Sequence, residues 1–230
     1  MMQNLIDQFQ LNFIDGDRWK LLLSGLGTTL LITFFAVILG IVLGFLVAVV
    51  RSAHDTTGKL KILNVIAQIY TTVIRGTPVL VQLMIIYYVV FASVNISKIF
   101  VAVLAFGLNS GAYVSEIVRS GIMSVDRGQM EAGRSLGFSY SRTMLYVILP
   151  QAFKNVLPAL GNEFITLLKE TSVSGYIAVS DLTKAGDIIR SRTFSAFMPL
   201  IAVALIYLFF VLIFTKLVSI LERRLRESDH

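Results

Sequence analysis

The chain has 230 residues, of which 56% are hydrophobic and only 15% are charged, and its mean hydropathy is +0.78. A soluble domain is usually about 45–50% apolar and about 25% charged, so this composition places most of the chain in a lipid bilayer. The absence of cysteine excludes disulfides and thiolate chemistry, and two histidines do not support a metal cluster. The net charge of +6 comes from basic residues that flank apolar runs, which argues against nucleic-acid binding.

Residues 1–21 are expected to form an extracytoplasmic amphipathic segment. They contain Asp7, Asp15 and Asp17 before their first basic residue, Arg18. A cleavable secretory signal begins with positive charge and has a short apolar core. The segment therefore does not resemble a signal peptide, and we expect it to lead into the first membrane span.

Five stretches have the length of a membrane span, which takes about 20 apolar residues as a helix. They cover residues 21–50, 62–91, 99–118, 156–179 and 195–217. The second stretch is interrupted by Arg75, Gly76, Thr77 and Pro78, and the fourth is unusually polar. The sequence thus predicts an all-α integral membrane protein with about five transmembrane helices in a domain of residues 22–222. A basic tail, residues 223–230, follows.

The distribution of lysine and arginine predicts the orientation, because these residues accumulate on the cytoplasmic side. The connections on one side contain twelve of them and those on the other side contain six. This places the N-terminus outside and the C-terminus in the cytoplasm. The longest connection, residues 119–155, then faces the cytoplasm.

That connection predicts a helix–turn–helix beneath the membrane. Residues 129–136 suit a short helix, which Gly137 can end by adopting a left-handed conformation. Ser139 or Ser141 can cap a second helix, and Pro150 marks a break or kink near its end. Shape alone would equally suit a surface helix that merely links two spans.

The residues of this loop resemble the EAA loop of ATP-binding-cassette importer permeases. The family pattern is Glu-Ala-Ala, three residues, Gly, nine residues, Ile, any residue, Leu-Pro. Here Glu131-Ala132-Gly133 is followed at that spacing by Gly137 and then by Val147-Ile148-Leu149-Pro150. The departures are Gly133 for the second alanine and Val147 for isoleucine.

The resemblance covers roughly residues 22–222. Residues 74–78 with Gln82 look like the second-span signature of polar amino-acid permeases, and residues 161–165 with Leu168, Lys169, Thr171 and Ser172 are similar to their fourth span. It implies a bacterial cytoplasmic membrane protein that pairs with an identical or homologous permease subunit. It also implies an ATPase subunit dimer and an extracytoplasmic amino-acid-binding protein as partners. The ATPase-coupling residues would be Glu131, Ala132, Gly133, Arg134 and Gly137.

The chain is expected to be a transport subunit and not itself an enzyme. No Gly-x-x-x-x-Gly-Lys-Ser/Thr phosphate loop occurs in it, so ATP and Mg²⁺ would bind to the partner ATPase. The sequence suggests no metal site and no cofactor of its own. Coupling between hydrolysis and transport would then have to be mechanical.

Charged residues within spans are costly, by about 2.5–3.5 kcal/mol at the centre, and usually face a partner or a wet cavity. Arg75 either contacts a substrate carboxylate or pairs with Glu163 or Glu170. Glu163 offers an acceptor for a substrate ammonium group. The candidate substrate contacts are Arg75, Thr77, Asn162, Glu163, Thr166 and Lys169.

One ion pair and one close packing of helices are also expected. Glu116 is expected to pair with Arg119 one turn later on the same helix. Gly40 and Gly44 have the spacing of small residues that let helices approach closely, within or between subunits.

Two other classes of function remain as alternatives. A secondary transporter would use Glu163 or Glu116 as a proton site and need neither an ATPase nor this loop; the lack of an evident internal repeat weakens that interpretation. A non-transporting scaffold or sensor would need no wet cavity. The sequence does not name the amino acid that is carried.

Overall fold

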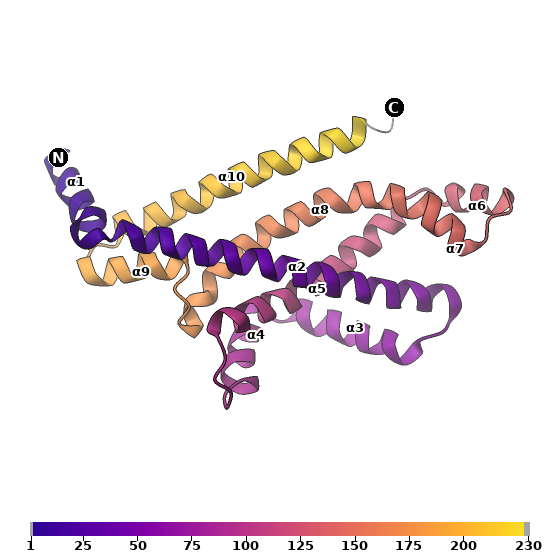
Figure 1. Cartoon of the computed structure of the whole chain (residues 1–230), viewed down its shortest axis with the longest axis horizontal. Coiled ribbons are helices and arrows are strands. Elements are labelled where there is room, and N and C mark those ends of the chain that lie inside the picture. Colours follow the sequence, from indigo (N-terminus) through magenta and orange to yellow (C-terminus); the bar gives the residue numbers. More distant parts are fainter. Residues whose placement is uncertain (1, 228–230) are drawn as a thin grey trace.

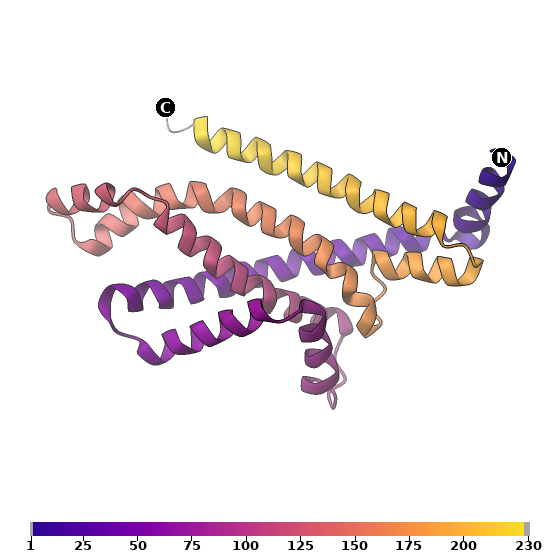
Figure 2. The same ribbon diagram turned by 180° about the vertical axis from the view of Figure 1, so that it is seen from behind.

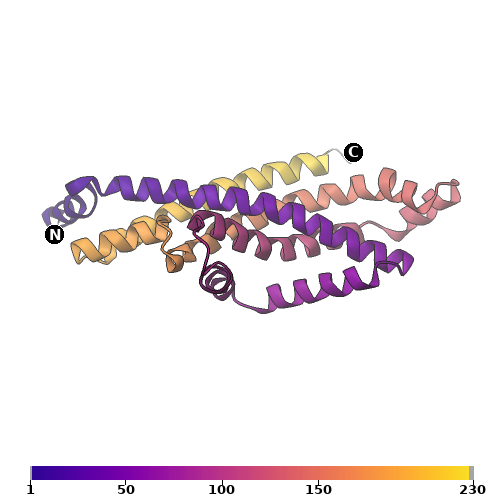
Figure 3. The same cartoon turned by 60° about the horizontal axis from the view of Figure 1, so that its bottom comes forward.

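The computed structural model describes residues 2–227, which contain helices and no strands. The molecule is elongated, and its long helices lie side by side along one axis (Figures 1 and 3). In chain order the helices are α1 (Met2–Phe9), η1 (Gln10–Ile14), η2 (Asp15–Asp17), α2 (Trp19–Thr57), α3 (Lys61–Gly76), α4 (Val79–Ile85), η3 (Ile86–Val90), α5 (Lys98–Met123), α6 (Arg127–Ser135), α7 (Tyr140–Thr143), η4 (Met144–Ile148), α8 (Leu149–Glu170), η5 (Thr171–Ile177), α9 (Leu182–Thr193) and α10 (Phe197–Glu227).

The two ends of the molecule carry different parts of the chain. The N-terminus, α9 and the start of α10 lie at one end, whereas α6, α7 and the α2–α3 turn lie at the other (Figures 1 and 2). The end of α10 points toward the α6–α7 end. Helix α1 and the end of α10 therefore lie toward opposite ends of the molecule.

Helices α2 and α5 form the central pair. A Cβ atom on Gly40 would lie 2.7 Å from Cβ of Ser110, and one on Gly44 would lie 2.6 Å from Cβ of Val114. Real Cβ atoms essentially never come that close, so the two glycines let the helix backbones approach. The expected close packing through these glycines is confirmed, and it occurs within one chain.

Three helices are long and apolar enough to cross a membrane by themselves, namely α2, α5 and α10. A fourth span is obtained if the bent pair formed by α3 with α4 and η3 is counted as one. The stretch expected as the fourth span, residues 156–179, lies in helix α8 (Leu149–Glu170) and the 3₁₀ turn η5 (Thr171–Ile177) that follows it. Helix α8 is less apolar than α2, α5 and α10, since it carries Lys154, Glu163, Lys169 and Glu170.

The interruption of the second span is a sharp bend. Helix α3 ends at Gly76, Thr77 and Pro78 are extended, and α4 leaves at 111°. The amide of Gln82, which is buried, donates hydrogen bonds to the Ile74 carbonyl at 2.8 Å and the Thr77 carbonyl at 3.0 Å, while its oxygen accepts one from Asn109 on α5 at 3.1 Å. A single glutamine thus satisfies carbonyls that the broken helix leaves free.

The end of the molecule that carries the N-terminus has its own apolar cluster. Phe13 from the N-terminal segment packs with Leu22 of α2 and with Leu182 and Ile189 of α9. Val203 of α10 completes the cluster. The N-terminal segment is therefore part of the folded body and holds α9 between α2 and α10.

Candidate coupling loop and translocation residues

The loop between α5 and α8 folds as the expected helix–turn–helix. The Asp126 side chain caps α6 by accepting a hydrogen bond from the Gly128 N–H at 2.6 Å. At the other end, the Phe138 N–H bonds to the Gly133 carbonyl at 3.1 Å and the Gly137 N–H to the Arg134 carbonyl at 3.0 Å. This pattern is a Schellman motif, and Gly137 has the required positive φ of 85°. The prediction that Gly137 ends this helix in a left-handed conformation is confirmed.

The second helix begins where the sequence indicated. The Ser139 hydroxyl accepts a hydrogen bond from the Arg142 N–H at 3.3 Å, so Ser139 rather than Ser141 caps α7. The helix does not end near Pro150, which lies in the first turn of α8. The π turn η4 directly precedes Pro150, so the hydrogen-bond ladder is already shifted where the proline lacks an N–H, and the helix continues to Glu170. The expected break is therefore a local π turn inside a continuous rod.

Helices α6 and α7 touch at one point of very close approach. Gly133 is the buried residue of α6, and it faces Thr143, which is fully buried. A Cβ atom at position 133 would lie 3.0 Å from the Thr143 Oγ1 atom and closer still to its Cγ2. The glycine that replaces the family's second alanine therefore makes room for Thr143.

The remaining residues of the expected coupling set lie on the surface. Glu131, Ala132, Arg134 and Gly137 are all exposed, and Leu136 beside them is 80% exposed. Gly133 is the exception, because it packs inward. The loop thus presents both charge signs and an apolar side chain outward from one end of the molecule.

A cluster of ions joins α2, α3 and α5 near that end. Arg51 of α2 donates a hydrogen bond to Glu116 of α5, and the Arg75 Nη1 atom of α3 lies 3.9 Å from the same Glu116 oxygen. Arg119 instead lies 3.9 Å from Asp55 of α2. The expected pair of Glu116 with Arg119 is wrong, because α2 runs along α5 and brings Arg51 closer.

The expected pairing of Arg75 with Glu163 or Glu170 is also wrong. Besides Glu116, the Arg75 guanidinium lies over the Tyr113 ring at 5.6 Å from its centroid. Glu163 instead accepts a hydrogen bond from the Ser110 hydroxyl at 2.8 Å. Because Ser110 and Tyr113 are three residues apart on α5, this helix brings Arg75 and Glu163 to neighbouring turns.

The other candidate substrate residues occupy two kinds of position. Thr77 has a structural role at the bend, since its hydroxyl donates to the Val73 carbonyl and accepts from Gln82, both at 2.8 Å. Asn162, Thr166 and Lys169 are exposed along one stripe of α8. Within residues 2–227, no group of three or more His, Cys, Asp or Glu side chains could hold a metal ion.

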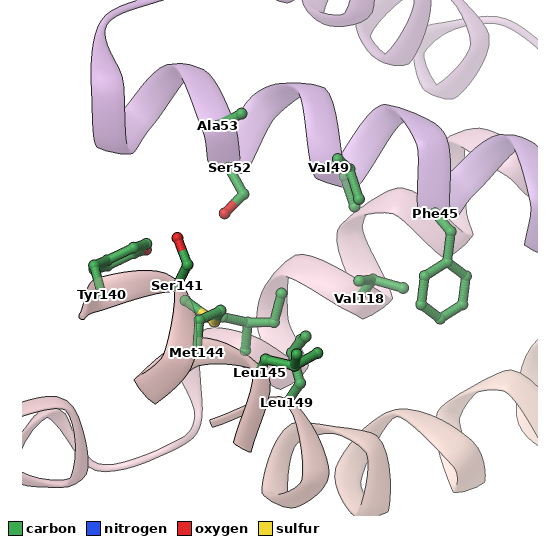
Figure 4. A pocket seen from close by; sticks show the side chains of 12 residues that line it. Phe45, Val49, Ser52, Ala53, Val118, Tyr140, Ser141, Met144, Leu145 and Leu149 are labelled. Carbon is green, nitrogen blue, oxygen red and sulfur yellow. The ribbon is translucent and has the colours of Figure 1, made fainter. Parts of the chain in front are cut away.

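An apolar cavity of about 590 Å³ lies between the loop and the spans. Figure 4 shows Phe45, Val49 and Ser52 of α2 on one side and Ser141, Met144 and Leu145 of α7 and η4 on the other. Sequence reasoning missed it, because its walls come from three segments far apart in the chain. The cavity leaves room for the α7–η4 segment to move against α2.

Comparison with known proteins agrees with this architecture. Residues 40–227 match the family model of binding-protein-dependent transport system inner membrane components. The chain is 39% identical to an arginine transport system permease protein of Bacillus subtilis (strain 168), over 90% of this chain and 94% of that protein. It is 37% identical to a putative glutamine transport system permease protein of Rickettsia typhi (strain ATCC VR-144 / Wilmington), over 89% and 92% of the two chains.

Solved structures give the same match. A chain from the crystal structure of an amino acid ABC transporter with histidines has a TM-score of 0.83 and 46% identity, over 89% of this chain and 94% of that chain. A chain of the MetNI methionine ABC transporter in an inward-facing conformation has a TM-score of 0.70, over 92% and 98% of the two chains. Its identity of 21% shows likeness of fold alone.

Proposed function

Since the chain belongs to the binding-protein-dependent transport system inner membrane components and is a permease subunit of the amino-acid ABC importer class, we propose that it passes the closure of a partner ATPase dimer to the substrate path through α6 and α7. The resemblance of the EAA loop is thereby confirmed as a family relationship. The ATP and Mg²⁺ that drive the cycle would bind to the partner chains.

One observation carries this proposal. Residues 140–170 form a continuous helical rod through α7, η4 and α8, which begins at the coupling loop and includes Glu163. At about 1.5 Å per residue the path along this rod, which includes the π turn η4 and Pro158 inside α8, is about 46 Å long. A displacement of α6 and α7 would therefore be transmitted directly to Glu163 and its partner Ser110 on α5.

The cavity beside the rod supports a rigid-body motion. Its walls are mostly apolar, and the flexible side chain of Met144 lies at the π turn where the rod meets it. Filling or opening this space would let α7 and η4 shift relative to α2. Such a movement is a switch between inward and outward access.

We propose that a polar α-amino acid passes along the exposed stripe of α8, beside Glu163. The Glu163 carboxylate would accept hydrogen bonds from the α-ammonium group of the substrate. Arg75 of α3, which lies against the neighbouring turn of α5, would attract the substrate carboxylate. Asn162, Thr166 and Lys169 would line the exposed stripe of α8. Glu163→Gln should weaken uptake with little change in ATPase binding, whereas equal uptake by this variant would remove Glu163 from the path.

The orientation proposed is N-terminus outside and C-terminus in the cytoplasm. Because the chain has no cysteine, a single cysteine can be placed at Leu136 or at Phe194, which are 80% and 96% exposed at opposite ends. A membrane-impermeant maleimide added to intact cells should label position 194 and reach position 136 only after permeabilisation. The reverse result would overturn the orientation.

A photo-crosslinker tests the docking of the ATPase. Placed at Leu136 it should form an adduct with the ATPase subunit, whereas the same group at Tyr176, which is 62% exposed in η5, should not. Adducts at both positions or at neither would contradict docking at α6 and α7. The proposed assembly contains a second permease subunit, identical or homologous, and an extracytoplasmic amino-acid-binding protein.

A further inference from the structure

The turn between α9 and α10 exposes an aromatic side chain in an unfavourable backbone conformation. Phe194 has φ of 53° and ψ of 23°, which is the left-handed region, and it is 96% exposed. A bulky residue is rarely found in this region because its Cβ crowds the backbone. Such outliers persist only where the surrounding structure holds them in place.

A buried asparagine holds this turn from the N-terminal segment. Asn12 is fully buried, and its Oδ1 accepts a hydrogen bond from the Thr193 hydroxyl at 2.8 Å. Its Nδ2 donates to the Ser195 hydroxyl at 3.3 Å and to the Gln8 carbonyl at 2.7 Å. Asn12 therefore hydrogen-bonds to the residue on each side of Phe194, across about 180 positions of sequence.

The turn lies at the end of the molecule farthest from α6 (Figures 1 and 2). The uncharged part of α10 begins at Phe197, so Phe194 precedes the first turn of that span. Phe197 is 71% exposed, and Arg192 beside the turn is exposed as well. Two exposed aromatic side chains and an exposed cation thus lie within six residues of chain at this turn.

We propose that Phe194 is an anchor for the extracytoplasmic amino-acid-binding protein, which would receive it in an apolar pocket with an acidic rim facing Arg192. A folded protein partner binds more tightly to a side chain whose backbone is already held in place, because less conformational entropy is lost on binding. Fluid lipid gains nothing from a clamped backbone, so the Asn12 contacts favour a protein over the bilayer surface. This inference rests on the proposed function for its orientation and partner.

The test measures binding of the amino-acid-binding protein that supports uptake in the reconstituted system. The permease–ATPase complex in nanodiscs should lose at least tenfold in affinity for it on Phe194→Ala, and its stimulation of ATP hydrolysis should fall, while basal hydrolysis stays unchanged. Asn12→Ala should weaken binding by about threefold, because the turn is released but the ring is kept. Tyr176→Ala, a change of another exposed aromatic side chain that lies in η5 and not in this turn, should stay within twofold of the wild type.

Two results would overturn the inference. One is wild-type affinity and stimulation in Phe194→Ala. The other concerns a Phe194→Trp, Trp19→Phe variant, whose only tryptophan in this chain is at position 194. If brominated lipid quenches its fluorescence and addition of the binding protein does not change that quenching, the residue is a membrane anchor. If the wild-type complex itself shows no stimulation by any amino-acid-binding protein, the proposed function fails, and this inference fails with it.

Discussion

Replacement of Gly133 by alanine tests the contact between α6 and α7. The new Cβ atom would lie 3.0 Å from Thr143 Oγ1 and closer to its Cγ2, whereas carbon atoms normally pack at about 3.5–4.0 Å. Thr143 is fully buried and donates to the Ser139 carbonyl at 3.1 Å, so it cannot turn away without losing that bond. The two helices must therefore separate.

The magnitude follows from two opposing terms. Overpacking a tight contact costs about 1–3 kcal/mol, and alanine in place of glycine inside a helix contributes about 1 kcal/mol of stability. We therefore expect a net loss of about 1 kcal/mol in the packing of the loop. Uptake per ATP hydrolysed should fall as well, since a loosened α6 transmits less of its motion to the rod.

The assay is a double-mutant cycle in the reconstituted transporter, followed by thermal stability and by uptake per ATP. Thr143→Ser removes the clashing Cγ2 and keeps the hydroxyl, so Gly133→Ala with Thr143→Ser should recover both quantities. Gly27→Ala, at a helical glycine with nothing within 4 Å, is the matched control: uptake per ATP should stay at the wild-type value, and stability should rise by up to about 1 kcal/mol from helix propensity alone. Wild-type behaviour of Gly133→Ala, or failure of the second change to rescue it, would refute the reasoning.

Two other predictions concern charges. Glu116→Gln should destabilise the junction of α2, α3 and α5 by about 1–2 kcal/mol in thermal unfolding, since it leaves the largely buried Arg51 without its carboxylate partner. Arg119→Gln is the control and should change stability by less than about 0.5 kcal/mol, because the pair of Arg119 with Asp55 is more exposed. Equal losses in the two variants would contradict the pairing of Glu116 with Arg51. Burial raises the pKa of Asp181 to about 6 from 3.8, so the folded protein holds a proton there between these values, and stability falls as the pH rises through this range. Asparagine can keep the cap that Asp181 gives to the Lys184 N–H at 2.7 Å, so Asp181→Asn should gain up to about 3 kcal/mol at pH 7.5 and nothing near pH 3.5. Melting temperatures at the two pH values measure this, and a variant less stable at pH 7.5 would show that the charge is needed.

Local signals in the sequence predict a structural feature correctly where the residues that form it are close together in the chain. The left-handed Gly137 and the cap from Ser139 depend on neighbours within a few residues, and both are confirmed. Close helix packing through Gly40 and Gly44 was also expected, because the spacing of small residues reports a helix face, but the partner helix α5 is known only from the structure.

The sequence could not give partners that depend on how the spans pack. Glu116 was assigned to Arg119 on its own helix, but the register of α2 against α5 selects Arg51. The clamp of Asn12 on Thr193 and Ser195 joins the two halves of the chain and has no local pattern. The cavity beside η4 likewise exists only once three distant segments are assembled.

The central claim is that α6 and α7 pass the work of a partner ATPase to the substrate path. It is tested most directly by the ratio of amino-acid uptake to ATP hydrolysis in proteoliposomes that contain permease, ATPase and binding protein. Glu131→Ala combined with Gly137→Ala, which removes an exposed carboxylate and strains a position with φ of 85°, should lower this ratio severalfold while hydrolysis continues. An unchanged ratio in the double variant would contradict the account.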